Sequence, residues 1–97
     1  GFVDVYGVDA DGRLVVLEIK RRTAGKGAAL QLARYIEAIK GDSDREVRGI
    51  IVAPSLAKGV QPLLATLNLE FKALSPRRCA QVLGRAEREK RLDSYLR

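Results

Sequence analysis

Two apolar stretches open the chain, at residues 2–8 and 14–19, and a short polar segment separates them. Both are rich in β-branched and aromatic residues, which are typical of strands. The intervening segment, Asp9-Ala10-Asp11-Gly12, begins with Asp and ends with Gly, as many tight turns do. The pattern therefore predicts a β-hairpin.

The second predicted strand alternates its side chains between two faces, as every strand does. One face receives Val15, Leu17 and Ile19, and the other receives Leu14, Val16, Glu18 and Lys20. We therefore expect Glu18 and Lys20 to be neighbours on one face of the sheet.

The turn decides whether Asp4 joins this pair, because a slip of one residue moves a strand's side chains to the opposite face. A two-residue turn at Asp11-Gly12 would place Asp4 opposite Ile19. A three-residue loop at residues 10–12, with Gly12 in the left-handed conformation, places Asp4 opposite Glu18 instead. Asp at the first turn position and Gly at the last favour the second register.

Two carboxylates brought this close repel each other unless a cation lies between them, and hard oxygen ligands suit Mg²⁺ or Mn²⁺. Such an ion lowers the pKa of bound water, and Lys20 can hold the attacking water or stabilise the developing negative charge. Asp4, Glu18 and Lys20 thus indicate phosphodiester hydrolysis. The alternative is structural, since a Glu-x-Lys pair on a strand is commonly the solvated face of a half-buried sheet.

The middle of the chain alternates between helical and strand patterns. Apolar residues at helical spacing predict a helix over residues 28–39, and Gly41 follows as a stop signal. Residues 47–53 form a nearly continuous apolar run, typical of a central strand, in which Arg48 must reach an edge or a partner.

A second helix is predicted over residues 56–67, although Pro62 would kink it or delay its start to about Lys58. A short strand follows at residues 69–74. The order strand-strand-helix-strand-helix-strand (β-β-α-β-α-β) predicts an α/β fold with a mixed central sheet, because strand-helix-strand crossovers leave parallel neighbours.

The last part of the chain is highly charged. Ser75-Pro76 is a helix-start signal, and a charged, weakly packing helix is predicted to run from there to about Lys90. Residues 89–96 resemble a sliding-clamp (PCNA) interacting peptide, with Leu92, Tyr95 and Leu96 at the apolar and aromatic positions. A frayed amphipathic end is the alternative.

Composition narrows the function further. The 97 residues suit one small domain, and a formal charge of +6 favours a polyanionic partner such as nucleic acid. The absence of histidine excludes Ser-His and Cys-His catalytic pairs, and the single cysteine, Cys79, is expected to be a packed thiol. Without an apolar run long enough to span a membrane, a cytoplasmic location is expected.

A basic, glycine-containing segment follows Lys20 and is a candidate DNA-backbone contact. The candidate DNA-binding residues are Arg21, Arg22, Lys26 and, on the next helix, Arg34. On that helix Gln31 and Tyr35 are four residues apart and therefore share one stripe. From the residues alone, Tyr35 is a core-edge aromatic and Gln31 a surface residue.

Asp4, then Glu18-Ile19-Lys20, then a helix carrying Gln31 and Tyr35, resembles the PD-(D/E)xK nuclease superfamily and its RecB-like branch. The segments GFVDVYGVDADGRLVVLEIKRR, QLARYIEAI and VRGIIVAPS are similar to the C-terminal nuclease domain of the NucS/EndoMS family of mismatch-specific DNA endonucleases. The resemblance covers roughly residues 1–75.

This resemblance implies a restriction-endonuclease-like fold in which Asp4 and Glu18 hold a divalent metal and Lys20 is the catalytic lysine. Gln31 and Tyr35 would line the site from the adjacent helix. Family members act as dimers on mismatched double-stranded DNA through a separate N-terminal domain. That domain and an upstream acid-bearing helix are expected to lie outside these 97 residues, and their absence could leave the fragment inactive by itself.

We therefore expect a nuclease core at residues 1–75 and a charged helix with a clamp-binding tail at residues 76–97. Two alternatives stay open. The same site could act on branched or flap DNA, because one scaffold serves many substrates. The chain could also be a non-catalytic basic module that binds DNA or a clamp.

Overall fold

A computed structural model describes residues 5–42, 44 and 46–85 of the chain. Its first element is the predicted hairpin, formed by strands β1 (Val5–Val8) and β2 (Leu14–Ile19) in antiparallel pairing. Val8 lies opposite Leu14, and the Asp9 amide donates to the Arg13 carbonyl at 2.9 Å. Residues 10–12 therefore form a three-residue loop, in which Gly12 has a left-handed φ of 82°. The predicted turn and register are confirmed.

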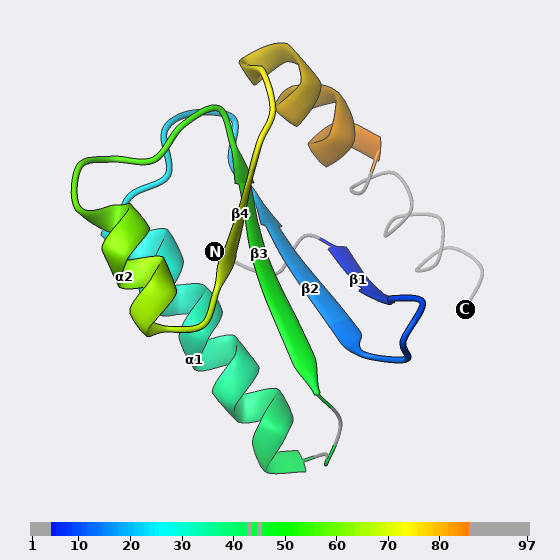
Figure 1. Ribbon diagram of the computed structural model, residues 1–97. Helices are drawn as coiled ribbons and strands as arrows, with labels where there is room; N and C mark the ends of the chain where they lie inside the picture. The colour runs from blue at the N-terminus through cyan, green and yellow to red at the C-terminus, as the bar shows by residue number, and fades with distance from the viewer. Residues whose placement is uncertain (1–4, 43, 45, 86–97) are drawn as a thin grey trace.

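The hairpin is one half of a four-stranded sheet with the order β1-β2-β3-β4 (Figure 1). Strand β3 (Val47–Ala53) lies parallel to β2, and strand β4 (Glu70–Ala73) lies parallel to β3. This is the predicted mixed sheet with β3 in a central position. The bounds of β3 are those predicted, and β4 is one residue shorter at each end than residues 69–74.

Helix α1 (Lys26–Asp42) connects β2 to β3 and is longer than the predicted residues 28–39. The expectation that Gly41 ends the helix was wrong. Among the described residues only Gly12 and Gly59 are glycines with positive φ, so Gly41 keeps the backbone conformation that lets the helix continue to Asp42.

Helix α2 (Val60–Thr66) connects β3 to β4 and begins later than residue 56 or Lys58, so the predicted start was wrong. Gly59 takes a left-handed φ of 84° immediately before it, and Leu56 instead forms a parallel β-bridge with Ala24. Pro62 then falls within the first turn, where its missing amide hydrogen removes no helical hydrogen bond.

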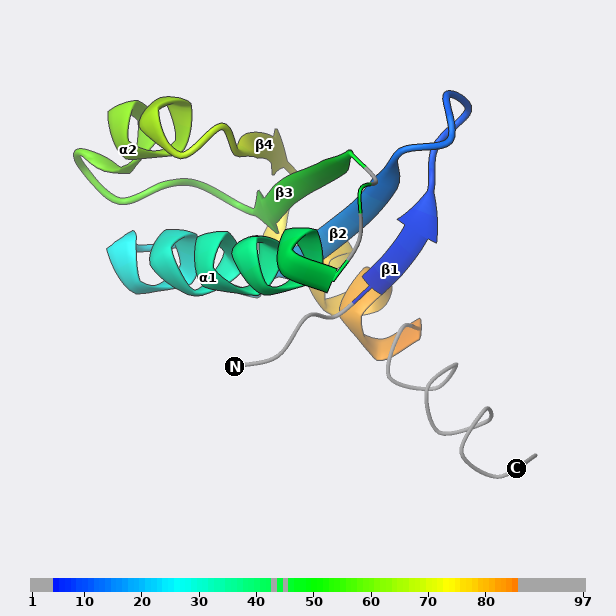
Figure 2. The ribbon, with the colours of Figure 1, turned by 90° about the horizontal axis from the view of Figure 1, so that it is seen from below.

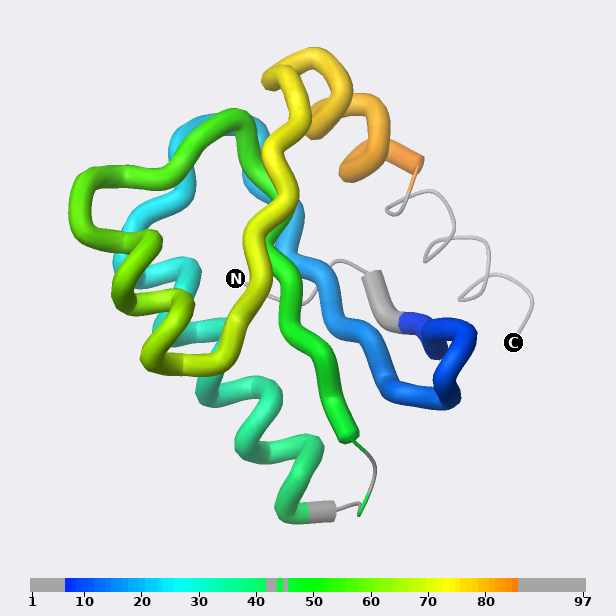
Figure 3. The backbone as a smooth tube through the Cα atoms, in the orientation of Figure 1, coloured from blue at the N-terminus to red at the C-terminus, as the bar shows by residue number. Residues whose placement is uncertain are grey.

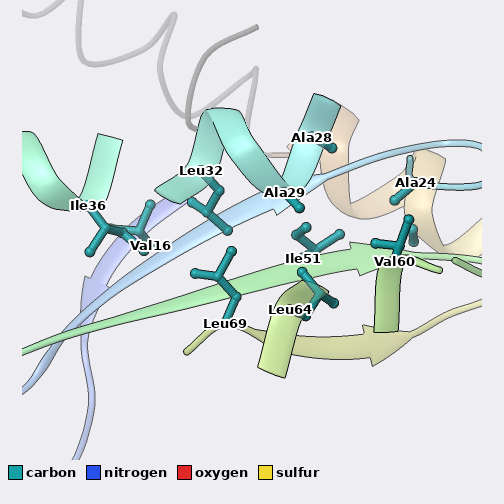
Figure 4. Close-up of a cluster of buried hydrophobic side chains, with 11 residues drawn as sticks. Val16, Ala24, Ala28, Ala29, Leu32, Ile36, Ile51, Val60, Leu64 and Leu69 are labelled. Atoms are coloured by element: carbon teal, nitrogen blue, oxygen red, sulfur yellow. The ribbon is translucent and has the colours of Figure 1, made fainter. Parts of the chain in front are cut away.

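Two apolar clusters hold helices against opposite faces of the sheet (Figure 2). On one face, Leu32 of α1 and Leu64 of α2 pack around Ile51 of β3, as the close-up in Figure 4 shows. Gly49 permits this approach, since an added Cβ would lie 2.7 Å from Leu69 Cδ2. The core residues of this face are buried (Val16, Ala24, Ala28, Ala29, Leu32, Ile36, Ile51, Ala53, Val60, Leu64 and Leu69).

A third helical segment, residues 76–85, covers the other face. Ser75 caps it, because its Oγ accepts a hydrogen bond from the Arg78 amide at 3.2 Å. Cys79 is fully buried against Ile19 and Val52, so the predicted packed thiol is confirmed, and this part of the helix packs more firmly than expected. Burial raises the pKa of the Cys79 thiol. No helix in the described ranges is long and apolar enough to cross a membrane.

Candidate active site

Glu18 is the only charged side chain among the buried residues that the structure describes. It lies near the end of β2, opposite Ile51 of the parallel strand β3, on the face that α1 covers. Its side chain is 4% exposed. A buried carboxylate destabilises the fold unless a cation or hydrogen bonds compensate for its lost hydration. A purely structural role therefore gives no reason for a carboxylate at this position.

Lys20 lies beside Glu18, as the alternation of the strand predicted. Its Nζ is 3.7 Å from Glu18 Oε1, a distance that makes an ion pair but exceeds a direct hydrogen bond. The Lys20 amide donates to the Val52 carbonyl at 2.8 Å, so the pairing of β2 with β3 extends past Ile19. The Lys20 side chain is 38% exposed. The ammonium thus reaches solvent while the carboxylate stays inside.

Asp4, the second predicted metal ligand, lies outside the described residues. The register of β1 and β2 is the one on which its pairing with Glu18 depends, since Val5 lies opposite Leu17. Within the described residues no three acidic, cysteine or histidine side chains gather into a metal-binding group. Glu18 is therefore a single oxygen donor there, and its buried carboxylate has the hard-ligand chemistry that Mg²⁺ or Mn²⁺ requires.

Gln31 and Tyr35 both lie on α1, where Gln31 is partly buried and Tyr35 is 40% exposed. Ala33, Glu37 and Lys40 line a groove between α1, α2 and the start of β4. At 100° per residue, Gln31 and Tyr35 lie on the other flank of α1, away from α2 and β4. Their predicted contact with the site stays a prediction.

The predicted DNA-binding residues fall into two groups. Arg21, Arg22 and Lys26 are exposed in or beside the connection from β2 to α1, at the strand end where Glu18 and Lys20 lie. Arg34 is exposed too, but it lines the groove on the α2 flank and so is separated from the other three. The predicted clamp-binding residues lie outside the described part of the chain (Leu92, Tyr95 and Leu96).

The opposite end of the sheet carries a network of ion pairs. Arg48 of β3 donates to both carboxylate oxygens of Glu70, at 2.6 and 2.8 Å, and to Asp9 Oδ2 at 3.2 Å. Arg13 Nε donates to the same Asp9 oxygen at 3.0 Å, and Arg13 Nη2 to Asp11 Oδ2 at 2.9 Å. The expectation that Arg48 needs a partner is confirmed.

These contacts shift the pKa values of the two central acids. The hydrogen bond from Arg48 lowers the pKa of Glu70, against a smaller opposing effect of desolvation. For Asp9, burial raises the pKa, but hydrogen bonds from the Arg13 and Asp11 amides and from Arg48 together outweigh it and lower the pKa. The same bonds raise the pKa of the Arg48 guanidinium, so Arg48, Asp9 and Glu70 are all charged at neutral pH.

The connection between β3 and α2 carries polar groups that the sequence pattern did not indicate. Ser55 Oγ lies 2.8 Å from Thr23 Oγ1, and Lys58 is exposed nearby in the chain. One signal could have found them. Residues 19–36 and 47–69 contain no Asp or Glu, although the whole chain has 12 acids.

Comparison with known proteins shows which family has this sequence and fold. A family model described as the endonuclease NucS C-terminal domain matches residues 1–92. Endonuclease NucS of Pyrococcus furiosus is 54% identical over 76 residues, covering 78% of this chain and 28% of that protein. Endonuclease NucS of Methanopyrus kandleri is 51% identical and is covered to 29%. The chain thus spans less than a third of the length of these relatives.

Solved structures agree with the fold. A crystal structure of a repair endonuclease from Pyrococcus abyssi superposes with a TM-score of 0.73 at 51% identity, covering 78% of this chain and 34% of that one. A structure of an EndoMS complex with double-stranded DNA superposes with a TM-score of 0.72 at 49% identity, covering 78% and 32%. The mixed sheet and its flanking helices are therefore those of these repair endonucleases.

Proposed function

Because this chain belongs to the family of endonuclease NucS C-terminal domains, we propose that it is the DNA-cleaving domain of a metal-dependent repair endonuclease. The observation that carries the proposal is the pair formed by Glu18 and Lys20. An otherwise apolar strand in the centre of the sheet holds one buried carboxylate, with a lysine ammonium 3.7 Å away at the surface. Burying such a charge is difficult to explain by stability alone.

The proposed roles follow from the chemistry of each side chain. Asp4 and Glu18 would hold a Mg²⁺ or Mn²⁺ ion through carboxylate oxygens. When bound, such an ion activates water and neutralises charge on the scissile phosphate. Lys20, a compact cation with three hydrogen-bond donors, would orient the attacking water or bind a phosphate oxygen as negative charge develops. Gln31 and Tyr35 would complete the pocket from α1.

The substrate of the full-length protein is proposed to be double-stranded DNA that contains a mismatch. Support comes from the related structure of an EndoMS–DNA complex and from exposed cations at the strand end that carries Lys20. A homodimer as the active unit, and a sliding clamp bound through Leu92, Tyr95 and Leu96, are further proposals for the full-length protein.

The test is cleavage of mismatched duplex DNA in Mg²⁺ by the full-length protein carrying Glu18→Gln or Lys20→Ala. Each variant should lose about 10²–10⁴-fold in cleavage rate, the usual cost of removing a group that acts on the reacting atoms. Glu37→Gln, which neutralises an exposed acid of α1, is the matched control and should cleave like the wild type.

Calorimetric titration with Mn²⁺ adds a readout of the metal site itself. Glu18→Gln should weaken Mn²⁺ binding while circular dichroism shows an unchanged fold. Wild-type cleavage rates in the Glu18→Gln protein would rule out the proposed site. A wild-type protein that binds DNA but never cleaves it would favour the non-catalytic basic module.

A further inference from the structure

The connections that follow β2 and β3 are joined to each other around Ala24 and Leu56. The segment at residues 20–25 leads to α1, the segment at 54–59 leads to α2, and Figure 3 shows them leaving the same end of the sheet. Ala24 pairs with Leu56 in a parallel bridge, and its amide and carbonyl bond to Ser55 and Ala57 at 3.0 and 2.9 Å. The two segments therefore form one surface, here called the paired loops.

This surface carries positive charge that acids elsewhere in the described part of the chain do not neutralise. No acid occurs in residues 19–36 or 47–69, so every charged side chain in the paired loops is a cation. Arg21, Arg22 and Lys58 of the paired loops are exposed, as is Lys26 at the start of α1, and none of them forms an ion pair with an acid of the described residues. Exposed cations without acidic partners produce a local positive potential that attracts a polyanion.

Lys58 is part of the paired loops because it follows the bridge between Ala24 and Leu56. It lies two residues beyond Leu56, as Lys26 lies two residues beyond Ala24, the partner of Leu56. The first of the paired loops begins at Lys20, whose amide donates to the carbonyl of Val52 on the neighbouring strand. A polyanion that reaches Lys20 and Arg21 therefore lies at the end of the sheet from which the segment carrying Lys58 also leaves.

The hydroxyl pair adds hydrogen-bonding capacity to the same place. Thr23 Oγ1 and Ser55 Oγ are 2.8 Å apart, and both residues are exposed. Two hydroxyls that share one hydrogen bond use one of their two hydrogens, so the second can be donated outward. A hydroxyl donor beside lysine ammonium groups is a common way to bind a phosphate oxygen of DNA.

We propose that the connection from β3 to α2 is a second DNA-backbone contact of this domain, with Lys58 and the Thr23–Ser55 hydroxyl pair binding a phosphate of the duplex engaged at Lys20. This contact rests on the proposed DNA-cleaving function and extends it to a segment far away in the sequence. It is a positioning contact. A phosphate contact fixes the register of the duplex and carries no information about the bases.

The experiment measures binding of the full-length protein to duplex DNA, matched and mismatched, between 50 and 200 mM salt. Lys58→Ala should reduce the slope of log K against log salt by about 0.9, the value for one phosphate contact in duplex DNA. The wild-type affinity should consequently fall about threefold more than that of Lys58→Ala over this range. Both duplexes should show the same change.

Three further variants test whether the change in slope comes from the charge of Lys58. Lys40→Ala, which removes an exposed lysine from the last turn of α1 at the far end of that helix, should keep the wild-type slope. Lys58→Arg keeps the charge and should restore most of the slope. Thr23→Val combined with Ser55→Ala should weaken binding at every salt concentration with little change in slope, because no charge is lost.

A Lys58→Ala slope equal to those of the wild type and Lys40→Ala would overturn this inference and leave the proposed function intact, provided that the wild type still binds DNA. A wild-type protein that does not bind duplex DNA at any of these salt concentrations would overturn both. The melting temperature of each variant shows whether its fold is preserved.

Discussion

The charged side chains at the two ends of the sheet differ in whether they are paired with each other. At the end that holds the hairpin turn, Arg48 and Arg13 are surrounded by Asp9, Asp11 and Glu70, and the distances in this network run from 2.6 to 3.2 Å. At the other end, the cations of the paired loops face solvent, and Glu18 is buried beside Lys20. One end pairs its charges within the domain, while the other leaves its cations exposed to solvent.

The difference separates two uses of charge in a small basic domain. Paired charges can stabilise the fold, and exposed unpaired charges can bind a ligand. Ion pairs in the network connect the hairpin turn to β3 and β4, so they keep the hairpin in the register on which the Glu18 site depends. The exposed cations make no such connection. Their mutual repulsion is a cost that a bound polyanion would relieve.

The largest effect on folding is expected from the apolar core that supports both ends. Leu64 of α2 is 1% exposed, and Leu64→Ala should lower the free energy of unfolding by about 2–5 kcal/mol, because it leaves a cavity in the main cluster. Urea denaturation followed by circular dichroism measures this change. Gln61→Ala, at an exposed position of the same helix, should change it by less than about 0.5 kcal/mol.

A smaller, pH-dependent effect is expected at the ion-pair network. Arg48→Met removes the bonds to Glu70 and Asp9 and should lower the melting temperature by a few degrees at pH 7. The pKa values of Asp9 and Glu70 are held below their ordinary 3.8 and 4.5, so the unfolded chain binds protons first as pH falls. Their stabilisation is complete above about pH 5 and is lost below it.

Thermal unfolding between pH 3 and 7 tests this expectation. The wild type should lose stability more steeply below pH 5 than Arg48→Met, because the variant has less of the network left to lose. Lys72→Met, which changes an exposed lysine of β4, should follow the wild-type curve. Parallel curves for the wild type and Arg48→Met would show that the network contributes nothing to acid stability.

The smallest effect on folding is expected at the paired loops. Arg21→Ala combined with Arg22→Ala should leave the free energy of unfolding within about 0.5 kcal/mol of the wild type, since neither side chain has a described ion-pair partner. The same variant should lower the salt slope of duplex DNA binding by about 1.8. Lys40→Ala with Lys72→Ala removes the same charge elsewhere and should leave that slope unchanged. A destabilised Arg21/Arg22 variant would mean that both ends of the sheet serve stability.

The hairpin and the chemistry of its second strand could be predicted from the sequence because their determinants are local. Asp9 and Gly12 fix a three-residue loop, and the alternation of β2 then places Glu18 and Lys20 on one face. The apolar run of β3 was equally clear. The ends of the helices were predicted less well. Gly41 adopts a helical conformation, so it does not end α1. The segment before α2 pairs with Ala24 through Leu56, so the helix begins only after Gly59.

What the sequence determined by itself was the order of strands and helices, the strand register of the hairpin, and the shared face of Glu18 and Lys20. These depend on neighbours within a few residues, whose backbone preferences and alternation are encoded locally. Only the tertiary structure decided that Arg48 meets Asp9 across 39 residues, and that Thr23 meets Ser55 across 32. Such contacts arise when parallel strands bring distant loops to one edge, and no local preference specifies them.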